Sequence, residues 1–257
     1  MVPRRAFGRT GLHLSIVGFG AFKIGRNEGI KYPSSYALPS DADVDALVAR
    51  LRDLGVNYVD TAPAYGTSEA RLGRALAAHP ADAFIVSTKV GEARTDGRST
   101  FDFSDAGVTA SIHRSLRRLG RERLDLVWVH SDGRDVEIIR DTDVVPTLRR
   151  LRDEGLVGAI GFSGKTPDGA RAAMDWADGL MIEYHLDDRS HEAVIVEAAS
   201  RETGVVVKKG LGAGHLDPDA AVRFLIARPE IASVVIGSLN PAHIAGNVAV
   251  AIDAAGA

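Results

Sequence analysis

The chain has 257 residues, of which 45% are hydrophobic and 25% are charged, and its formal net charge is −3. This composition is typical of a globular protein with a large core, and without a positive excess it gives no bulk attraction to nucleic acid or anionic membrane. No cysteine is present, which excludes disulfides, thiolate nucleophiles and cysteine metal ligands. We also find no apolar stretch long enough for a membrane span and no secretory signal pattern, and we therefore expect a cytoplasmic protein.

Short apolar segments alternate with segments of helical periodicity along the whole chain. The predicted strands cover 14–19, 56–59, 84–87, 124–129, 157–162, 180–184, 205–207 and 233–236. A predicted helix follows each of them, at 42–54, 68–77, 105–119, 144–154, 167–174, 190–203, 218–227 and 241–252. Several of these helices stop at a glycine, the usual helix terminator: Gly55, Gly120, Gly155 and Gly204.

The strands are continuous Val, Ile and Leu runs, which indicates a parallel sheet covered on both faces. Eight strand–helix units in about 250 residues predict an α/β fold of the (β/α)8 TIM barrel type, forming a single domain over 1–257. The alternative, an open doubly wound sheet, is disfavoured because no G-x-G-x-x-G follows the first strand. Segments 4–7 and 12–15 flank the turn GRTG and predict a short N-terminal β-hairpin that closes the barrel floor. The segments 25–41, 91–104 and 210–217 are predicted to be long loops.

Four polar residues lie at or just after the ends of predicted strands two to four: Asp60, Tyr65, Lys89 and His130. Each has an ordinary interpretation when taken alone, as a turn cap, a packed aromatic, a solvated lysine and a core histidine. Because the carboxyl ends of barrel strands carry the active site, their common position predicts that the four side chains converge on one rim.

Longer motifs around these residues resemble the aldo-keto reductases. They are FGRTGLHLSIVGFGAF, GVNYVDTAPAYGTSEARLGRAL, FIVSTKVG, SLRRLGRERLDLVWVHS, LRDEGLVGAIGFS and SVVIGSLNPAHIAGNV, in this order. The resemblance implies a (β/α)8 barrel and an NAD(P)H-dependent oxidoreductase that reduces a small aldehyde or ketone to an alcohol. It implies no metal, and NADPH is favoured over NADH.

The chemistry explains why these residue types belong together. Hydride arriving at a carbonyl carbon leaves negative charge on oxygen, so the site needs a proton donor near that oxygen. A tyrosine hydroxyl has an ordinary pKa of about 10, and a neighbouring ammonium would lower it. We therefore expect Tyr65 as the general acid, Lys89 as the group that lowers its pKa, Asp60 as the anchor of Lys89, and His130 as the group that orients the carbonyl.

The cofactor residues follow by resemblance from motif position. They are Gly20, Ala21, Phe22, Asp60, Ser163, Met181, Lys208, Gly210, Leu211, Gly212, Gly237, Ser238, His243 and Asn247. Two of these positions depart from the family pattern: Met181 stands where a glutamine is frequent, and Lys208 where a tyrosine commonly stacks on the nicotinamide. The basic pair for the 2′-phosphate is also altered, with Gly237 and His243 in place of a lysine and an arginine.

The substrate pocket is less defined by the sequence. The candidate lining residues are Phe22, Lys23, Tyr32, Tyr36 and Trp128, although loop or core packing explains the aromatic ones equally well. The short segment 210–217 leads us to expect an open, shallow site. The arginine run 114–123 is interpreted as a solvated helix face. Two other functions stay open: a nucleotide-binding regulatory or scaffold barrel with little turnover, and a lyase or isomerase that uses Lys89 as a Schiff-base amine. The oligomeric state is left open.

Overall fold

Eight parallel strands form a closed barrel in the computed structural model, which describes residues 1–30 and 33–256. The strands in chain order are β3 (Val17–Gly20), β4 (Tyr58–Asp60), β5 (Ile85–Val90), β8 (Leu124–His130), β9 (Val157–Ser163), β10 (Gly179–Glu183), β11 (Gly204–Lys208) and β12 (Ser233–Ile236). Each pairs with the next, and β12 pairs with β3 to close the barrel. The predicted (β/α)8 fold is confirmed.

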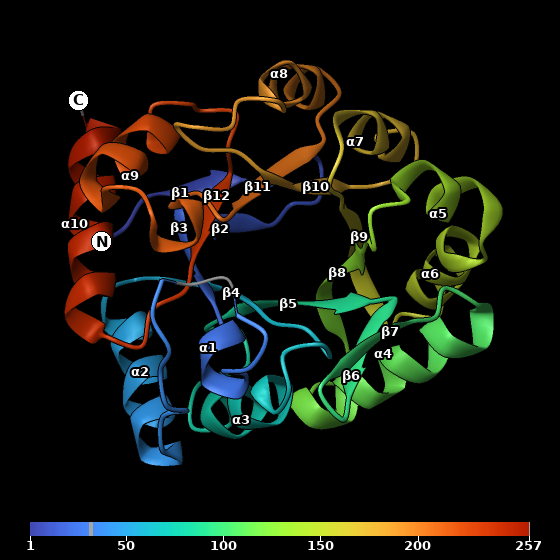
Figure 1. Ribbon diagram of the computed structural model, residues 1–257, viewed down its shortest axis with the longest axis horizontal. Helices are drawn as coiled ribbons and strands as arrows, with labels where there is room; N and C mark the ends of the chain where they lie inside the picture. The colour runs from blue at the N-terminus through green and yellow to red at the C-terminus, as the bar shows by residue number, and fades with distance from the viewer. Residues whose placement is uncertain (31–32, 257) are drawn as a thin grey trace.

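Helices surround the barrel as a ring (Figure 1). The main ones are α2 (Asp41–Asp53), α3 (Ser68–Leu76), α4 (Asp105–Leu119), α6 (Val144–Asp153), α7 (Pro167–Ala173), α8 (Glu192–Ser200), α9 (Pro218–Ile226) and α10 (Pro241–Gly256). Local sequence sets their ends: Ser40 and Asp43 form a capping box at the start of α2, and Gly120 adopts a left-handed φ of 64° at the end of α4.

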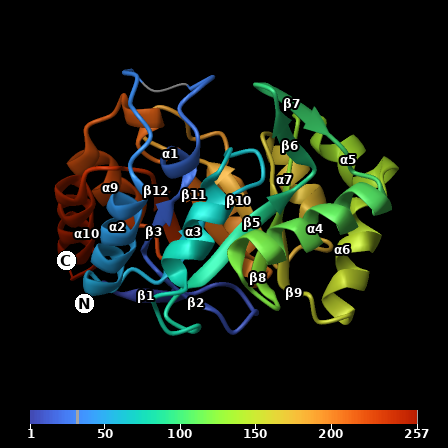
Figure 2. The ribbon, with the colours of Figure 1, turned by 90° about the horizontal axis from the view of Figure 1, so that it is seen from below.

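The N-terminal hairpin lies at the floor of the barrel. Strands β1 (Arg4–Ala6) and β2 (His13–Ser15) are antiparallel, and Figure 2 shows them at the end of the barrel opposite to the short helix α1 (Phe22–Gly25). Phe7 follows β1, is fully buried, and packs edge-on against Trp128 with ring centroids 5.9 Å apart. The predicted hairpin is therefore confirmed, and Phe7 fills the base of the barrel.

Three segments are more ordered than the sequence led us to expect. The segment 91–104 contains a hairpin, β6 (Glu92–Thr95) and β7 (Arg98–Phe101), whose turn residues Asp96 and Gly97 have φ of 49° and 76°. An additional helix, α5 (Asp135–Asp141), precedes α6. The loop after β11 also contains a short 3-10 turn, η1 (Gly212–Gly214). The long loop predicted over 91–104 therefore contains a hairpin that we did not predict, although Asp-Gly is a favoured two-residue hairpin turn.

The apolar side chains form two layers separated by the sheet. An inner cluster fills the barrel and includes Phe7, Tyr58, Trp128, Met181 and Val206. A larger outer cluster lies between the strands and the helices. Because successive side chains of a strand point to opposite faces, a residue two positions beyond an inner-cluster residue also points into the barrel, one layer closer to the rim.

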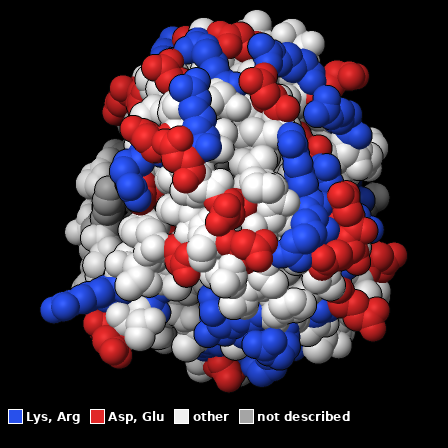
Figure 3. Space-filling view, turned by 90° about the vertical axis from the view of Figure 1, so that its right-hand side faces the viewer, with Lys and Arg blue, Asp and Glu red and all other residues white. Residues whose placement is uncertain are grey.

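Charged side chains of both signs are interspersed over the face that carries α4, α5 and α6 (Figure 3). Several pair across this surface: Arg150 lies 2.8 Å from both Asp105 and Glu154. Within residues 1–30 and 33–256, no helix has the length and apolar character that a membrane crossing requires.

Candidate functional site

The barrel strands bring the strand-end residues together as the uppermost layer inside the barrel. Asp60 follows Tyr58 by two positions on β4, His130 follows Trp128 on β8, and Lys208 follows Val206 on β11. Ser163 ends β9 and pairs in register with His130. Since Tyr58, Trp128 and Val206 belong to the inner cluster, their successors face the barrel mouth.

Asp60 and Lys89 form a buried ion pair at the centre of this layer. Lys89 Nζ lies 2.5 Å from Asp60 Oδ2, and the two side chains are 1% and 4% exposed. The same ammonium donates to the carbonyl of Thr61 at 2.9 Å, while Ser87 Oγ donates to the other oxygen of Asp60 at 2.7 Å. Burial lowers the pKa of Lys89, and the carboxylate of Asp60 opposes that effect. Asp60 and Lys89 are therefore direct partners, which is the arrangement that the predicted anchoring role requires.

Tyr65 lies in the loop between β4 and α3, within reach of both Lys89 and His130. Lys89 Nζ is 4.9 Å from the Tyr65 ring centroid, and the His130 ring is 6.3 Å away and perpendicular. Gly66 explains how the loop is held: its φ is +63°, and a Cβ there would lie 2.3 Å from the carbonyl oxygen of Gly25. The structure therefore brings all four predicted catalytic residues to one place.

Glu92 adds a fifth group that we did not anticipate from the sequence. Its Oε2 lies 2.8 Å from Nδ1 of His130, with the two side chains 14% and 19% exposed. Burial acts to raise the pKa of Glu92, but His130 and Ser99 outweigh it and hold that pKa at about 2. Burial lowers the pKa of His130, against the opposing effect of Glu92. The Asp96–Gly97 dipeptide was the sequence signal that would have placed Glu92 on a hairpin.

Lys208 turns toward the end of β9. Its Nζ donates to Ser163 Oγ at 2.9 Å and to the carbonyl of Gly164 at 2.8 Å. Burial, with the nearby charges of Lys209 and Lys89, lowers the pKa of Lys208 to about 7. Met181, the other altered position, is 1% exposed inside the inner cluster, and its thioether offers at most a weak acceptor.

The other predicted cofactor residues border the same mouth or the helix beyond it. Gly20 ends β3 and Gly237 directly follows β12, and a Cβ on Gly20 would lie 2.9 Å from Val235 Cγ1 and 3.6 Å from Gly237 N. The Val235 side chain and the backbone of Gly237 therefore pack closely against Gly20, at the start of the segment that leads into α10. Helix N-termini and exposed backbone N–H groups bind phosphate, so the donor set fits a dinucleotide.

The remaining residues of the cofactor set differ in exposure. Ala21 is fully buried and donates its backbone N–H to the carbonyl of Asp60 at 2.8 Å. Gly210 is buried, Leu211 and Gly212 are half-buried, and Ser238 is half-buried and accepts from the backbone N–H of Asn240. On α10, His243 is exposed while Asn247 is 8% exposed and lines a small internal cavity with Ile244.

The candidate substrate residues do not all lie at the rim. Phe22 packs edge-on against Tyr65 with centroids 5.0 Å apart, and Lys23 Nζ lies 5.3 Å from the Tyr36 ring centroid. Tyr32 lies outside the described residues. Trp128 is fully buried against Phe7. Of the two interpretations open for it, pocket lining and core packing, the structure favours core packing, because Trp128 belongs to the inner cluster one layer below His130.

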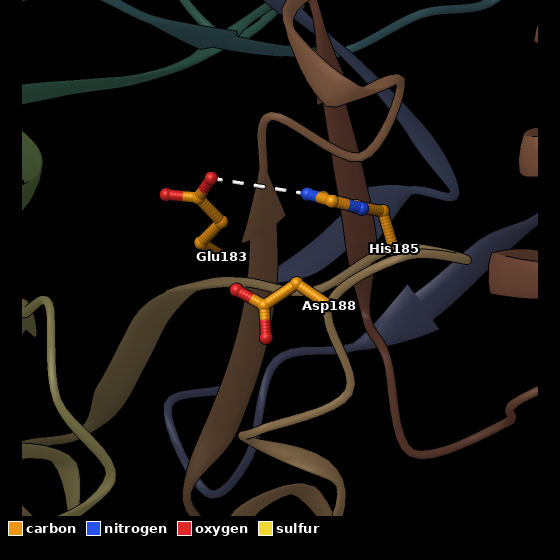
Figure 4. A group of neighbouring side chains, drawn as sticks. All are labelled: Glu183, His185 and Asp188. Atoms are coloured by element: carbon orange, nitrogen blue, oxygen red, sulfur yellow. Dashed lines mark ion pairs between the residues drawn. The ribbon is translucent and has the colours of Figure 1, made fainter. Parts of the chain in front are cut away.

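A second polar group lies at the end of β10 and in the segment after it. Glu183, His185 and Asp188 offer ligand atoms that all lie within 4.8 Å of one another (Figure 4). Lys209 already forms an ion pair with Glu183, and His185 Nδ1 accepts from the backbone N–H of Asp187. We therefore interpret this group as an ion-pair cluster that fixes the turn after β10.

Comparison with known proteins agrees with this arrangement. The aldo/keto reductase family model matches residues 17–218. A solved putative aldo-keto reductase from Pseudomonas aeruginosa is 42% identical, with a TM-score of 0.90 over 98% of this chain and 94% of that one.

Two relatives of known name match across most of the chain. The D-threo-aldose 1-dehydrogenase of a Pseudomonas species is 28% identical over 94% of this chain and 91% of that protein. The L-galactose dehydrogenase of Arabidopsis thaliana is 31% identical over 90% of this chain and 72% of that protein. The chain belongs to the aldo-keto reductase family and is a nicotinamide-dependent oxidoreductase.

Proposed function

We propose that Tyr65 exchanges the proton with the substrate oxygen in an NAD(P)H-dependent interconversion of carbonyl and alcohol. Lys89 lowers the pKa of that tyrosine, Asp60 anchors Lys89, and His130 contacts the substrate oxygen. The observation that carries this assignment is the buried Lys89 ammonium, paired with Asp60 at 2.5 Å and 4.9 Å from the Tyr65 ring centroid. The bound nicotinamide supplies or accepts the hydride.

The electrostatics of the pair support this role for Lys89. Asp60 compensates the buried ammonium, and Thr61 provides a second acceptor. An ammonium that stays charged beside a phenol stabilises the phenolate and lowers the pKa of the hydroxyl. The proton of Tyr65 therefore becomes easier to transfer near neutral pH.

We place the nicotinamide carboxamide at Ser163 and Lys208. The hydroxyl and the ammonium are 2.9 Å apart and both face the barrel mouth. In its ammonium form, Lys208 has one N–H left after its contacts with Ser163 and Gly164, and this N–H can take the place of the donor that a glutamine at Met181 would provide. The side chain of Lys208 offers a methylene stem where the family commonly offers an aromatic ring.

We further propose that NADPH is preferred over NADH by a small factor. By resemblance, Gly237 and the exposed His243 stand at the positions of the basic pair for the 2′-phosphate, so a bidentate arginine is missing at these two positions. Exposed charge contacts contribute at most about 1 kcal/mol, so we expect a ratio of dissociation constants below about tenfold.

The geometry disfavours the Schiff-base alternative. A Schiff-base lysine attacks as a neutral and accessible amine, whereas the Lys89 ammonium is 1% exposed and donates to Asp60 and to Thr61. The scaffold alternative does not explain why Asp60, Tyr65, Lys89 and His130 converge. The names of two relatives include an aldose and a galactose dehydrogenase, so sugars with a free anomeric hydroxyl belong in the substrate panel.

Substitution of Tyr65 by phenylalanine tests the assignment. We expect Y65F to lose turnover by roughly 10²-fold to 10⁴-fold, the usual contribution of a positioned acid, while nicotinamide fluorescence reports unchanged binding of NADPH. The control is Y184F, which removes a hydroxyl from a fully buried tyrosine of the outer cluster and should leave turnover unchanged. Full turnover by Y65F would refute the role of Tyr65, and failure of the wild type to bind either NADPH or NADH would refute the cofactor assignment.

A further inference from the structure

Two arginines from distant parts of the chain lie close together at the rim of the barrel mouth. Arg26 is the residue that ends helix α1, and Arg94 belongs to strand β6 of the hairpin. Both approach Gly29, because a Cβ on that glycine would lie 3.1 Å from Nη2 of Arg26 and 3.5 Å from Nη2 of Arg94. Figure 2 shows α1 and the hairpin β6–β7 at the same end of the barrel.

The hairpin directs Arg94 toward the mouth. Successive residues of a strand point to opposite faces, and Glu92, two positions earlier on β6, lies 2.8 Å from His130. Arg94 therefore belongs to the face of the hairpin that carries Glu92. Its register partner Ser99 donates to Glu92, as expected for residues of one face. Arg98 precedes Ser99 by one residue and therefore lies on the opposite face.

Local contacts hold Arg26 beside the proposed acid Tyr65. Nη1 of Arg26 donates at 3.3 Å to the carbonyl of Ala64, the residue directly before Tyr65. Its Cζ lies 5.2 Å from the ring centroid of Phe22, and that ring packs edge-on against Tyr65. Nε and Nη2 donate to two carbonyls of the loop that follows α1. These contacts use three of the five N–H groups of Arg26, so two remain for a ligand.

The charge of the two arginines is not compensated by a carboxylate in contact with them. Within residues 1–30 and 33–256, neither guanidinium forms an ion pair, and the oxygens of Glu92 already face Ser99 and His130. Burial and the charge of Arg94 lower the pKa of Arg26, while Glu92 and Tyr65 oppose them. Two adjacent guanidinium groups repel each other, and an anion bound between them would relieve the repulsion. Since the whole chain has a net charge of −3, this positive rim is a local feature.

We propose that Arg26 and Arg94 form a subsite for an anionic group of the substrate, which makes the preferred substrate a carbonyl compound that also carries a carboxylate or a phosphate. A guanidinium presents paired N–H donors that match the oxygens of either group. The inference rests on the proposed function where it places the carbonyl oxygen at Tyr65. The anion subsite itself is independent of that placement.

The hairpin offers a matched set of variants. R94M removes one guanidinium of the subsite, and R94K keeps the charge but loses the paired donors. The control is R98M, which removes the same charge from the same hairpin on its opposite face. We do not use Arg26 for the test, since its contacts hold its own loop.

The first measurement is binding without chemistry, by calorimetry on the NADP⁺ complex, which cannot reduce a ketone. The probes are 4-acetylbenzoate with its neutral isostere 4-acetylbenzamide, and 4-acetylphenyl phosphate with neutral 4-hydroxyacetophenone. We expect the wild type to bind at least one anionic probe about fivefold or more tightly than its neutral partner, as one partly exposed ion pair of about 1 kcal/mol provides. The probe with the larger ratio identifies the group as carboxylate or phosphate.

The variants then assign that preference to the rim. We expect R94M to weaken the preferred anionic probe about fivefold and to leave the neutral one unchanged, with R94K intermediate and R98M like the wild type. Raised ionic strength should reduce the preference of the wild type. Equal affinity of the wild type for anionic and neutral probes, or no detectable binding of either anionic probe, overturns the proposal. An R98M protein affected as much as R94M also overturns it, and R94K decides in place of R94M if the latter does not fold.

The second measurement is turnover of 4-formylbenzoate and 4-formylbenzamide with NADPH. The ratio of their kcat/KM values should fall about fivefold in R94M, through a higher KM for the benzoate, since the arginine acts on binding and not on the proton transfer. If Y65F retained full turnover while the binding results held, the proposed function would fail and the anion subsite would stand. If Y65F were inactive and the wild type bound anionic and neutral ketones equally, the proposed function would stand and the subsite would fail.

Discussion

Replacement of Lys89 by methionine should destabilise the barrel strongly, because it leaves Asp60 buried with one less partner. The lost contacts are the 2.5 Å ion pair and the 2.9 Å bond to Thr61, and Ser87 remains as the donor to Asp60. Removing one partner of a buried pair costs about 3–5 kcal/mol. The carboxylate is 4% exposed, so water compensates little. We expect K89M to lose about this much free energy of unfolding.

The double variant D60N/K89M separates stability from chemistry. The D60N substitution removes the carboxylate that K89M leaves without its ammonium partner. We therefore expect the double variant to regain at least half of the free energy of unfolding that K89M loses. Turnover should stay low in both variants, since neither has an ammonium beside Tyr65. R171M serves as the exposed control, because Arg171 and Glu197 pair at 2.9 Å with side chains 43% and 42% exposed, and such pairs contribute at most about 1 kcal/mol.

The assay is urea unfolding followed by tryptophan fluorescence, since Trp128 and Trp176 are both buried, alongside steady-state turnover with NADPH. A K89M protein within about 1 kcal/mol of the wild type, no more affected than R171M, would refute the argument. A D60N/K89M protein that is as unstable as K89M would show that the cost is lost packing, with the unpaired charge of Asp60 contributing little.

Two further outcomes follow from the barrel interior. Folding lowers the pKa of Lys208 to about 7 from an ordinary 10.5. The buried ammonium therefore reduces the free energy of unfolding, and this reduction is complete below pH 7. It is relieved as pH rises from about 7 toward 10.5, where the folded protein loses the proton and the unfolded chain still holds it. The stability advantage of K208M over the wild type should therefore shrink between pH 6 and pH 9 in urea unfolding, and an equal difference at both values would contradict the lowered pKa. F7A should cost about 3–5 kcal/mol, because the ring lies within 2.0 Å of where a Cβ on Gly179 would stand. Its Kd for NADPH, measured by fluorescence, should not change, since Phe7 lies at the opposite end of the barrel.

Much of the barrel could be predicted because its strands are apolar on both faces and its helices carry clear end signals. The predicted helix 105–119 matches α4, and the predicted strand 233–236 matches β12. The strand-end residues were also predictable, since a parallel barrel carries the ends of all its strands on one rim. The short helix α5 was missed because its seven residues are too few for a helical apolar repeat to stand out.

The direction of individual side chains could not be predicted in the same way. The sequence placed Lys208 at a strand end, but its turn toward Ser163 depends on the neighbouring strands β9 and β10, which lie far from it in the chain. The sequence left Trp128 open between pocket lining and core packing for a related reason. A large aromatic near a strand end can face the mouth or the layer below it, and the alternation of the strand decides between them.

The hairpin β6–β7 can change the surroundings of His130 without changing the barrel strands. Asp60 with Lys89, and Ser163 with Lys208, are partners that both belong to barrel strands, so a change in either pair disturbs the barrel. His130 differs, because its carboxylate partner Glu92 belongs to the hairpin β6–β7. The hairpin can vary without altering strand packing, since loops tolerate change better than the elements they connect. Substitutions at Glu92 should therefore change the surroundings of His130 while the Asp60–Lys89 pair and the strands remain as they are.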